Sequence, residues 1–369
     1  MLMVRELGPG GTERQMTEIA QALDPSRFQV HAGCFHEGVR ADDLRAAGIP
    51  ILRLRVTSFM KPNALTGAWQ LGSYLRRKRI QLVHTFDYPL NCFGAPVART
   101  FSVPVVLSSQ RAHRHLTPGA YLKILRVTDR LVNGIVVNSE SVRREMIIQE
   151  HVPAERMHLC YNGIDTKRFH PRGRARMPAL ENATLVIGVV CVLRPEKGLQ
   201  TLLRAFAQIV PAHPGVRLVI VGDGPELSGL GALAGELGIF DDCVFQSAVA
   251  DVAPWLRSID LFVLPSLSEA LSNSLMEAMA CGCTCIASCV GGNPELIQDA
   301  ETGLLFEAGN PCDLAKKLSL VISNQVLRIR LAEASSTLIR TRFSLETSAG
   351  RMAQIYSSYL DKVFARRRR

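Results

Sequence analysis

Short apolar runs and longer amphipathic stretches alternate along the whole chain. In the first half, the apolar runs predict strands at 27–35, 51–56, 80–85 and 103–109. The stretches between them predict helices at 40–47, 64–78 and 90–100. Strands that alternate with helices in this way predict a parallel sheet wound with helices, whose functional residues lie at the carboxyl ends of the strands.

The alternation resumes in the second half, where strands are predicted at 185–193, 217–221, 243–246 and 261–265. After Gly303 we expect only helices. A chain of 369 residues is too long for one ordinary core, so two domains are expected, 1–170 and 185–346. The segment 171–184 opens with Arg, Gly and Pro residues and is predicted to be a linker.

The stretch 266–303 carries the strongest chemical signal. After the strand at 261–265, its Ser and Asn residues can cap a helix over 274–280 that ends at Gly282. Such a junction presents unpaired backbone N–H groups and the positive end of a helix dipole, which together suit a phosphate. The predicted donor contacts are therefore Leu271, Ser272, Asn273 and Ser274.

Two glutamates frame this junction, Glu269 and Glu277, with seven residues between them. Glu277 can accept hydrogen bonds from both hydroxyls of a ribose, and Glu269 can do so for a sugar attached to the phosphates. After the strand at 185–193, the cations Arg194 and Lys197 can neutralise a diphosphate. Together these residues indicate a nucleotide-sugar site. The alternative is that both glutamates are solvated surface residues and that Lys197 forms a structural salt bridge.

The spacing of the two glutamates, followed by EAMACG, GGNPELI and TGLLF, resembles the signature of retaining glycosyltransferases of family 4. Similar segments occur along nearly the whole chain: GPGGTERQ, VVNSESVRREM, YNGIDTKRFHP, LRPEKG, VGDGPE and IDLFVLPSLSEA. The resemblance implies an α/β protein of the GT-B fold, with two Rossmann-like doubly wound parallel-sheet domains facing across a cleft. It also implies transfer of a hexose with retention and without a covalent carboxylate nucleophile.

Three residues are expected to act in catalysis: Glu269, Arg194 and Lys197. Lys197 matches the family pattern well. The usual glycine–arginine pair before it reads Cys191-Val192 here, and Arg194, on the same strand face as Val192, is expected to take over the role of that arginine.

The resemblance also implies roles for residues near the two ends of the chain. It places Gly10 and Gly11, in a glycine loop that opens a helix at 12–23, across the cleft from the nucleotide, where they are expected to bind the donor. The last helix, at 347–364, is expected to pack back on the first domain, and 365–369 to form a basic tail.

Several polar residues lie near predicted strand ends in the first domain: His84, Asp87, Arg111, His113 and His115. Arg111 and His113 are the candidates for contacts with the acceptor or with a phosphate of the donor. A structural role for each histidine is the alternative.

The positive charge is concentrated in the first domain. Residues 1–170 carry 23 Lys and Arg against 14 Asp and Glu, whereas 171–369 carry 20 against 19. The densest cluster, Arg76-Arg77-Lys78-Arg79, suits anionic lipid headgroups or a phosphorylated acceptor, with a merely soluble basic face as the alternative. The basic residues lack the interleaved aromatics of single-strand binders, so no nucleic-acid partner is expected.

No apolar run approaches the roughly 18 residues needed to span a bilayer, and the first residues lack the apolar core of a signal peptide. We therefore expect a cytoplasmic protein, with peripheral contact at the inner face of the cytoplasmic membrane as a further hypothesis. No Asp-x-Asp is present, and no metal or cofactor is expected beyond the nucleotide-sugar co-substrate. Cys281, Cys283, Cys285 and Cys289 are crowded, but core thiols are favoured over a metal cluster.

The predicted activity is transfer of a hexose from a nucleoside-diphosphate sugar to a glycan or lipid-linked acceptor. The expected setting is the synthesis of cell-surface polysaccharide, lipopolysaccharide or glycolipid. Two alternatives stay open. An enzyme of the same fold would transfer to water or phosphate, or epimerise the sugar. A non-catalytic relative would bind membranes or nucleic acid through its basic residues.

Overall fold

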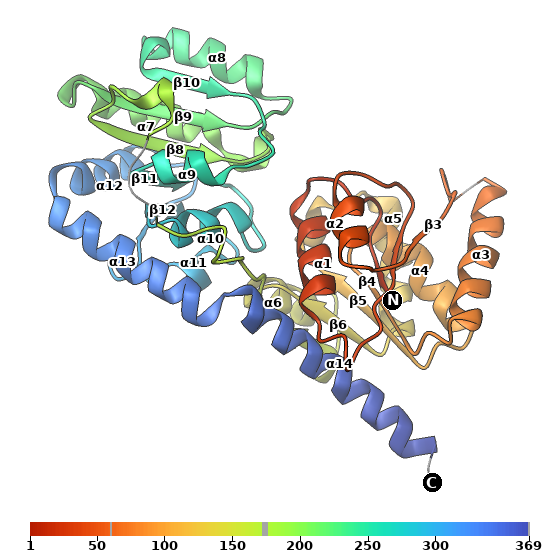
Figure 1. Cartoon of the computed structure of the whole chain (residues 1–369). Coiled ribbons are helices and arrows are strands. Elements are labelled where there is room, and N and C mark those ends of the chain that lie inside the picture. Colours follow the sequence, from red (N-terminus) through yellow and green to blue (C-terminus); the bar gives the residue numbers. More distant parts are fainter. Residues whose placement is uncertain (60, 172–175, 368–369) are drawn as a thin grey trace. The chain divides into compact units, whose positions relative to one another are not determined.

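The computed structural model describes residues 1–59, 61–171 and 176–367 (Figure 1). The chain forms two compact units. The first comprises Met1–Gly163 together with Leu345–Arg369, and the second comprises Ile164–Ser344. Among the described residues, no helix has both the length and the apolar character that crossing a bilayer requires.

The first unit is built on a seven-stranded sheet in the order β3-β2-β1-β4-β5-β6-β7, with every neighbouring pair parallel. Its strands are β1 (Leu2–Met3), β2 (Ala32–Cys34), β3 (Ile51–Arg53), β4 (Leu82–Thr85), β5 (Val105–Gln110), β6 (Gly134–Val137) and β7 (Met157–Leu159). Its helices are α1 (Gly11–Ala22), α2 (Arg40–Ala46), α3 (Asn63–Arg77), α4 (Tyr88–Thr100), α5 (Gly119–Leu131), α6 (Glu140–Ile148) and α14 (Leu345–Arg367).

The C-terminal helix α14 belongs to the first unit, where it packs against α1 (Figure 1). Tyr356 on this helix lies within hydrogen-bonding distance of His84, at 2.7 Å from Nδ1, and Tyr359 lies 2.6 Å from Nε2 of His158. Met352 and Tyr356 are also part of the hydrophobic core of this unit. The helix therefore joins the first unit through both apolar burial and polar pairs.

The second unit is built on a six-stranded sheet in the order β10-β9-β8-β11-β12-β13, again with parallel neighbours. Its strands are β8 (Leu185–Val190), β9 (Val216–Val221), β10 (Cys243–Gln246), β11 (Leu261–Leu264), β12 (Thr284–Ser288) and β13 (Leu304–Phe306). Its helices are α7 (Leu199–Ile209), α8 (Leu227–Glu236), α9 (Ala253–Ser258), α10 (Asn273–Ala280), α11 (Asn293–Leu296), α12 (Pro311–Ser323) and α13 (Gln325–Arg342).

The expectation of helices alone after Gly303 is wrong. Leu304–Phe306 forms the edge strand β13, paired with β12, and the helices begin only at Pro311. Leu304 and Phe306 are buried in the core of the second unit. A strand of three residues is too short to show a period along the sequence, so its burial depends on pairing with β12.

The second unit begins at Ile164 and ends at Ser344, a few residues from the predicted domain boundaries at 170 and 346. Ile164 pairs with Ser344 in an isolated bridge at the start and end of the second unit. Within the predicted linker, residues 172–175 lie outside the described residues, but Arg176 pairs with Asp260 at 2.9 Å and Leu180 is buried. The later part of 171–184 is thus packed on the second unit.

Part of the predicted basic tail at 365–369 is helical in the structure. Residues 365–367 continue α14, and 368–369 lie outside the described residues.

Candidate functional site

The strand order of the second unit reverses at β8 and β11. From β8 the chain proceeds to β9 and β10 on one side, while β11, β12 and β13 follow on the other. In open parallel sheets, ligands bind at this reversal, outside the carboxyl ends of the two strands. The loop after β8 carries Lys197, and the loop after β11 carries Glu269.

These two loops are joined by an ion pair. The ammonium of Lys197 donates to Oε2 of Glu269 at 2.6 Å, and Oγ of Ser266 donates to the same oxygen at 3.2 Å. The loops also pack closely, because a Cβ at Gly198, whose φ is +62°, would lie 2.3 Å from the carbonyl oxygen of Pro265. Only glycine allows this approach without displacing one of the loops.

The pair keeps Lys197 charged. Burial alone would lower the pKa of Lys197, but the negative charge and hydrogen bond of Glu269 raise it above its usual value. An ammonium has three N–H donors, and Glu269 takes one of them. The structure therefore contains the salt bridge of the structural alternative, and it also holds a fixed cation at the reversal of the sheet.

Helix α10 begins beside this pair, at the end of the loop after β11. Ser272 is its N-cap and accepts from the amide of Leu275 at 3.3 Å, while the first bond of the helical ladder runs from the Met276 amide to the Ser272 carbonyl. The backbone at 271–274, where the phosphate contacts are predicted, precedes that ladder. Gly282, with a φ of +81°, follows the helix. Glu277 lies one turn inside α10 and is only 3% exposed, so it is not a solvated surface residue.

Arg194 differs from Lys197 in its surroundings. Its side chain is 60% exposed and lies 3.9 Å from Oε1 of Glu196, which is a loose contact. Val192, expected on the same face, is exposed as well. Arg194 is thus an accessible cation on the loop that carries Lys197, not part of the partly buried Lys197–Glu269 ion pair.

A third loop, which sequence reasoning did not assign, packs on the Glu269 loop. The amide of Gly292 donates to the carbonyl of Glu269 at 3.3 Å, and a Cβ on Gly292 would lie 2.2 Å from the carbonyl oxygen of Ala270. Asn293 is buried and donates to the Ser288 carbonyl at 3.0 Å, while its Oδ1 has no hydrogen-bond partner among the described residues. In the sequence, the signal for this loop was the GGNPE motif, which begins at Gly291 shortly after β12.

In the first unit, Gly10 is the N-cap of α1 and Gly11 is its first residue. Arg111 follows β5 and donates to Oδ1 of Asn162 at 2.5 Å, with its guanidinium 5.6 Å from the ring centre of Phe86. Burial lowers the pKa of Arg111 to about 10. Among the described residues, no carboxylate pairs with this guanidinium, so its charge is not neutralised locally.

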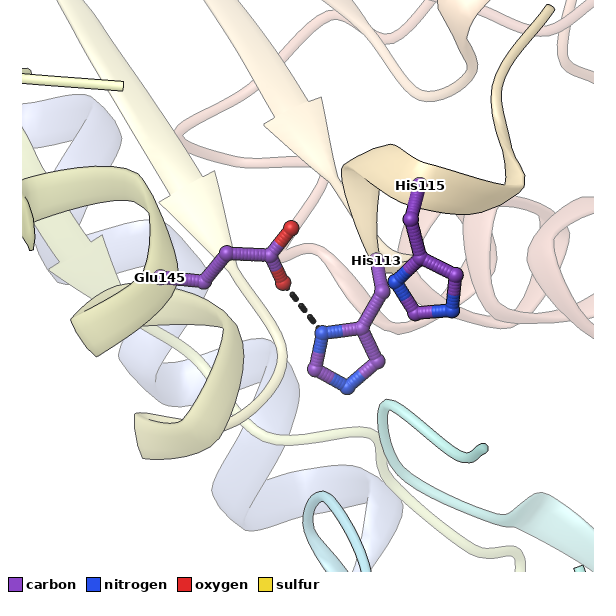
Figure 2. A group of neighbouring side chains, drawn as sticks. All are labelled: His113, His115 and Glu145. Atoms are coloured by element: carbon purple, nitrogen blue, oxygen red, sulfur yellow. Dashed lines mark hydrogen bonds and ion pairs between the residues drawn. The ribbon is translucent and has the colours of Figure 1, made fainter. Parts of the chain in front are cut away.

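Two of the candidate histidines in the first unit, His84 and His113, have different surroundings. His84 is fully buried within β4 rather than at its end, and its two nitrogens lie 2.7 Å from the Tyr356 hydroxyl and 2.8 Å from Oγ of Ser109. Burial lowers the pKa of His84 well below its usual value, so it is neutral and structural. His113 instead lies outside the strand and hydrogen-bonds to Glu145 (Figure 2).

The four crowded cysteines of the second unit differ in their exposure to solvent. Cys281, Cys283 and Cys285 are buried and Cys289 is exposed. Burial raises the pKa of the Cys281 thiol to about 12, which favours the neutral thiol over a metal-binding thiolate.

Two family models match the chain in succession. "Glycosyltransferase Family 4" matches residues 9–168, and "Glycosyl transferases group 1" matches residues 177–337. Together they account for most of both units. The chain belongs to the family 4, group 1 glycosyltransferases.

Curated relatives of this glycosyltransferase include the D-inositol 3-phosphate glycosyltransferase of Thermobispora bispora. It is 28% identical over 293 residues, which cover 73% of this chain and 67% of the relative. The N-acetyl-alpha-D-glucosaminyl L-malate synthase of Bacillus anthracis is 30% identical over 211 residues, covering 56% of this chain and 55% of the relative. The matches thus span about two thirds and about half of these relatives.

Among solved structures, Anabaena Alr3699/HepE in complex with UDP superposes with a TM-score of 0.82 at 22% identity. The match covers 97% of this chain and 99% of the Anabaena chain. At this identity the likeness shows the fold. Together with the two parallel-sheet units, it assigns this glycosyltransferase to the GT-B fold class.

Proposed function

We propose that this glycosyltransferase moves a hexose from a nucleoside-diphosphate sugar to a glycan or lipid-linked acceptor, with retention at the anomeric carbon. The observation that carries the proposal is the Lys197–Glu269 pair at the sheet reversal, directly before the capped N-terminus of α10. A fixed cation and a helix N-terminus at one strand edge suit a diphosphate. Cell-surface polysaccharide, lipopolysaccharide or glycolipid synthesis is the proposed setting.

In the proposed mechanism, the protein stabilises the departing nucleoside diphosphate. Lys197 and Arg194 offset the negative charge that develops as the bond to the anomeric carbon breaks, and the amides at 271–274 donate to the phosphates. Glu277 accepts from the ribose hydroxyls, and Glu269 accepts from the hydroxyls of the transferred sugar. No carboxylate is assigned as a covalent nucleophile.

We further propose that the acceptor is anionic and contacts the first unit at Arg111 and His113. The support is the partly buried guanidinium of Arg111, which has an amide rather than a carboxylate as its hydrogen-bond partner. A charge desolvated in this way interacts strongly with an anion. The names of the two curated relatives, which contain an inositol phosphate and malate, are in keeping with this class.

A thermal-shift panel of UDP, GDP and ADP with their common sugar conjugates tests the donor. Uridine nucleotides come first, because the Anabaena chain of the same fold was crystallised with UDP and with UDP-glucose. A ligand at about 100 times its dissociation constant stabilises by roughly 2.7 kcal/mol, and we expect a clear shift with one nucleotide series. No shift with any series would favour a non-catalytic relative. Nucleotide release without an acceptor would favour transfer to water or phosphate.

We also propose that the first unit touches anionic membrane through the exposed face of α3 and α5. On α3, Leu65 is 77% exposed and Trp69 is 71% exposed, and the basic cluster 76–79 follows at its end. Exposed apolar residues on α5 are Ile124, Val127 and Leu131, and its exposed basic residues are Lys123, Arg126 and Arg130. The helix α3 has no acidic residue.

The one acid of α5, Asp129, is buried and paired with Arg114 at 2.7 Å. The two helices therefore present apolar and positively charged side chains with no exposed acid of their own. This composition is typical of surfaces that bind anionic lipid headgroups.

Trp69→Ala tests the membrane contact by co-sedimentation with vesicles that contain phosphatidylserine. Because a buried large side chain contributes about 1.5–3 kcal/mol, we expect vesicle affinity to fall by about tenfold or more. Val326→Ala, at an apolar residue that is 79% exposed on α13 of the second unit, is the matched control. Equal binding of Trp69→Ala and the parent protein, or no weakening at higher salt, would contradict the proposal.

A further inference from the structure

Two histidines and a glutamate of the first unit lie together after the carboxyl end of β5 (Figure 2). His113 and His115 come from the loop that follows β5, and Glu145 comes from α6. The imidazoles of the two histidines are stacked, with ring centres 5.6 Å apart and ring planes 20° from parallel. One ligand atom from each of the three side chains lies within 4.8 Å of the other two.

The pairing of His113 with Glu145 already orders part of this cluster. Nδ1 of His113 hydrogen-bonds to Oε2 of Glu145, and Oε1 of Glu145 accepts from the amide of Arg114 at 2.8 Å. These two hydrogen bonds fix the carboxylate in position against the loop.

We propose that His113, His115 and Glu145 form a binding site for a divalent first-row transition-metal ion of the Zn²⁺ class. Two imidazole nitrogens and one carboxylate oxygen are a ligand set that zinc takes in proteins, with water completing the coordination. The ion replaces the proton shared by His113 and Glu145, and its charge is offset by the carboxylate. Hard cations such as Mg²⁺ are disfavoured, because they prefer ligand sets made of oxygen.

The third ligand distinguishes this site from a simple hydrogen-bonded pair. Zinc requires ligand distances of about 2.0–2.2 Å, so the three atoms must converge from their present separation. His115 is exposed, in the 3₁₀ turn Arg114–Leu116, and rotation of its side chain provides that movement. The nearby guanidinium of Arg114 does not oppose a cation with its full charge, because Asp129 pairs with it at 2.7 Å.

This site is distinct from the proposed donor site, which lies on the second unit at Lys197 and Glu269, whereas the three metal ligands all belong to the first. It shares His113 with the proposed acceptor contact. Binding of the ion orders the loop 111–116 against α6. The folded protein should therefore become more stable as the metal concentration rises. Failure of the metal site would thus leave the donor panel unaffected.

Titration of the chelator-treated full chain with Co²⁺, followed by visible absorption, tests the proposal. We expect one Co²⁺ per chain with ligand-field bands of nitrogen and oxygen coordination, displaced by Zn²⁺. Zn²⁺ alone should raise the melting temperature in a concentration-dependent way. His115→Ala removes an exposed ligand with little risk to folding, and we expect it to weaken binding by at least about tenfold.

Two further variants sharpen the result. Glu145→Gln keeps an acceptor for the Arg114 amide but removes the charge, and it should also lose about tenfold or more in affinity. His36→Ala removes another exposed histidine of the first unit and should bind Co²⁺ as the parent does. Unchanged binding by His115→Ala, a thiolate-to-cobalt charge-transfer band, or the absence of saturable binding would each overturn the site.

Discussion

Lys197→Ala is expected to lower the rate of transfer by about 10²–10³, because it removes a positioned cation that faces the charge developing on the leaving diphosphate. The ammonium is held by Glu269 at 2.6 Å, so its position is fixed before the donor binds. A positioned charge needs no reorganisation during the reaction, which is why its loss affects the rate more than a mobile surface charge would. Release of the nucleoside diphosphate in the presence of acceptor measures the change.

The matched control is Lys316→Ala, at an exposed lysine of α12 in the same unit. It removes the same formal charge away from the sheet reversal and should leave the rate within about twofold of the parent, since surface charges contribute little. The melting temperature of both variants separates loss of fold from loss of function. Near-normal release by a folded Lys197→Ala protein would remove Lys197 from the site.

Glu277→Gln is expected to weaken binding of the donor nucleotide by about tenfold to a hundredfold. A hydrogen bond to a charged group contributes about 1.5–3 kcal/mol, and an amide offers only one acceptor oxygen where the carboxylate offers two. Glu277 is 3% exposed on α10, so water does not readily replace the lost interaction. Isothermal titration with the nucleoside diphosphate identified by the thermal-shift panel measures the affinity.

A deoxy nucleotide gives this prediction its sharpest control. With the 2′,3′-dideoxy form, both proteins lack the ribose interaction, so the parent and Glu277→Gln should bind with similar affinity. Glu301→Gln, at an exposed glutamate of the same unit, should match the parent with either nucleotide. An equal loss of affinity by Glu277→Gln for both nucleotides would show that the carboxylate supports α10 rather than the ribose.

Much of the architecture could be predicted because it follows from local patterns. The buried strands β8 and β11 are continuous apolar runs, and α10 begins after a capping serine and ends before Gly282. These signals act over a few residues, so they are visible in the chain itself. The paired glutamates and the surrounding motifs indicated the family for the same reason.

Some elements were missed because their local signal is weak or misleading. Helix α8 contains Gly229, Gly231 and Gly235, each of which disfavours a helix in isolation. It forms nevertheless, with Leu230 and Ala234 buried in the core of its unit. Packing in the folded unit outweighs the low helix propensity.

The sequence alone determined the fold class, the order of most elements and the residues from which a nucleotide-sugar site can be built. Only the tertiary structure decided which residues meet. The pairing of Lys197 with Glu269 across 72 residues requires β8 and β11 to lie side by side, and the burial of His84 requires α14 to return to the first unit. The ionisation of Lys197 and the neutrality of His84 follow from these long-range contacts, because desolvation and neighbouring charge set the pKa of each group.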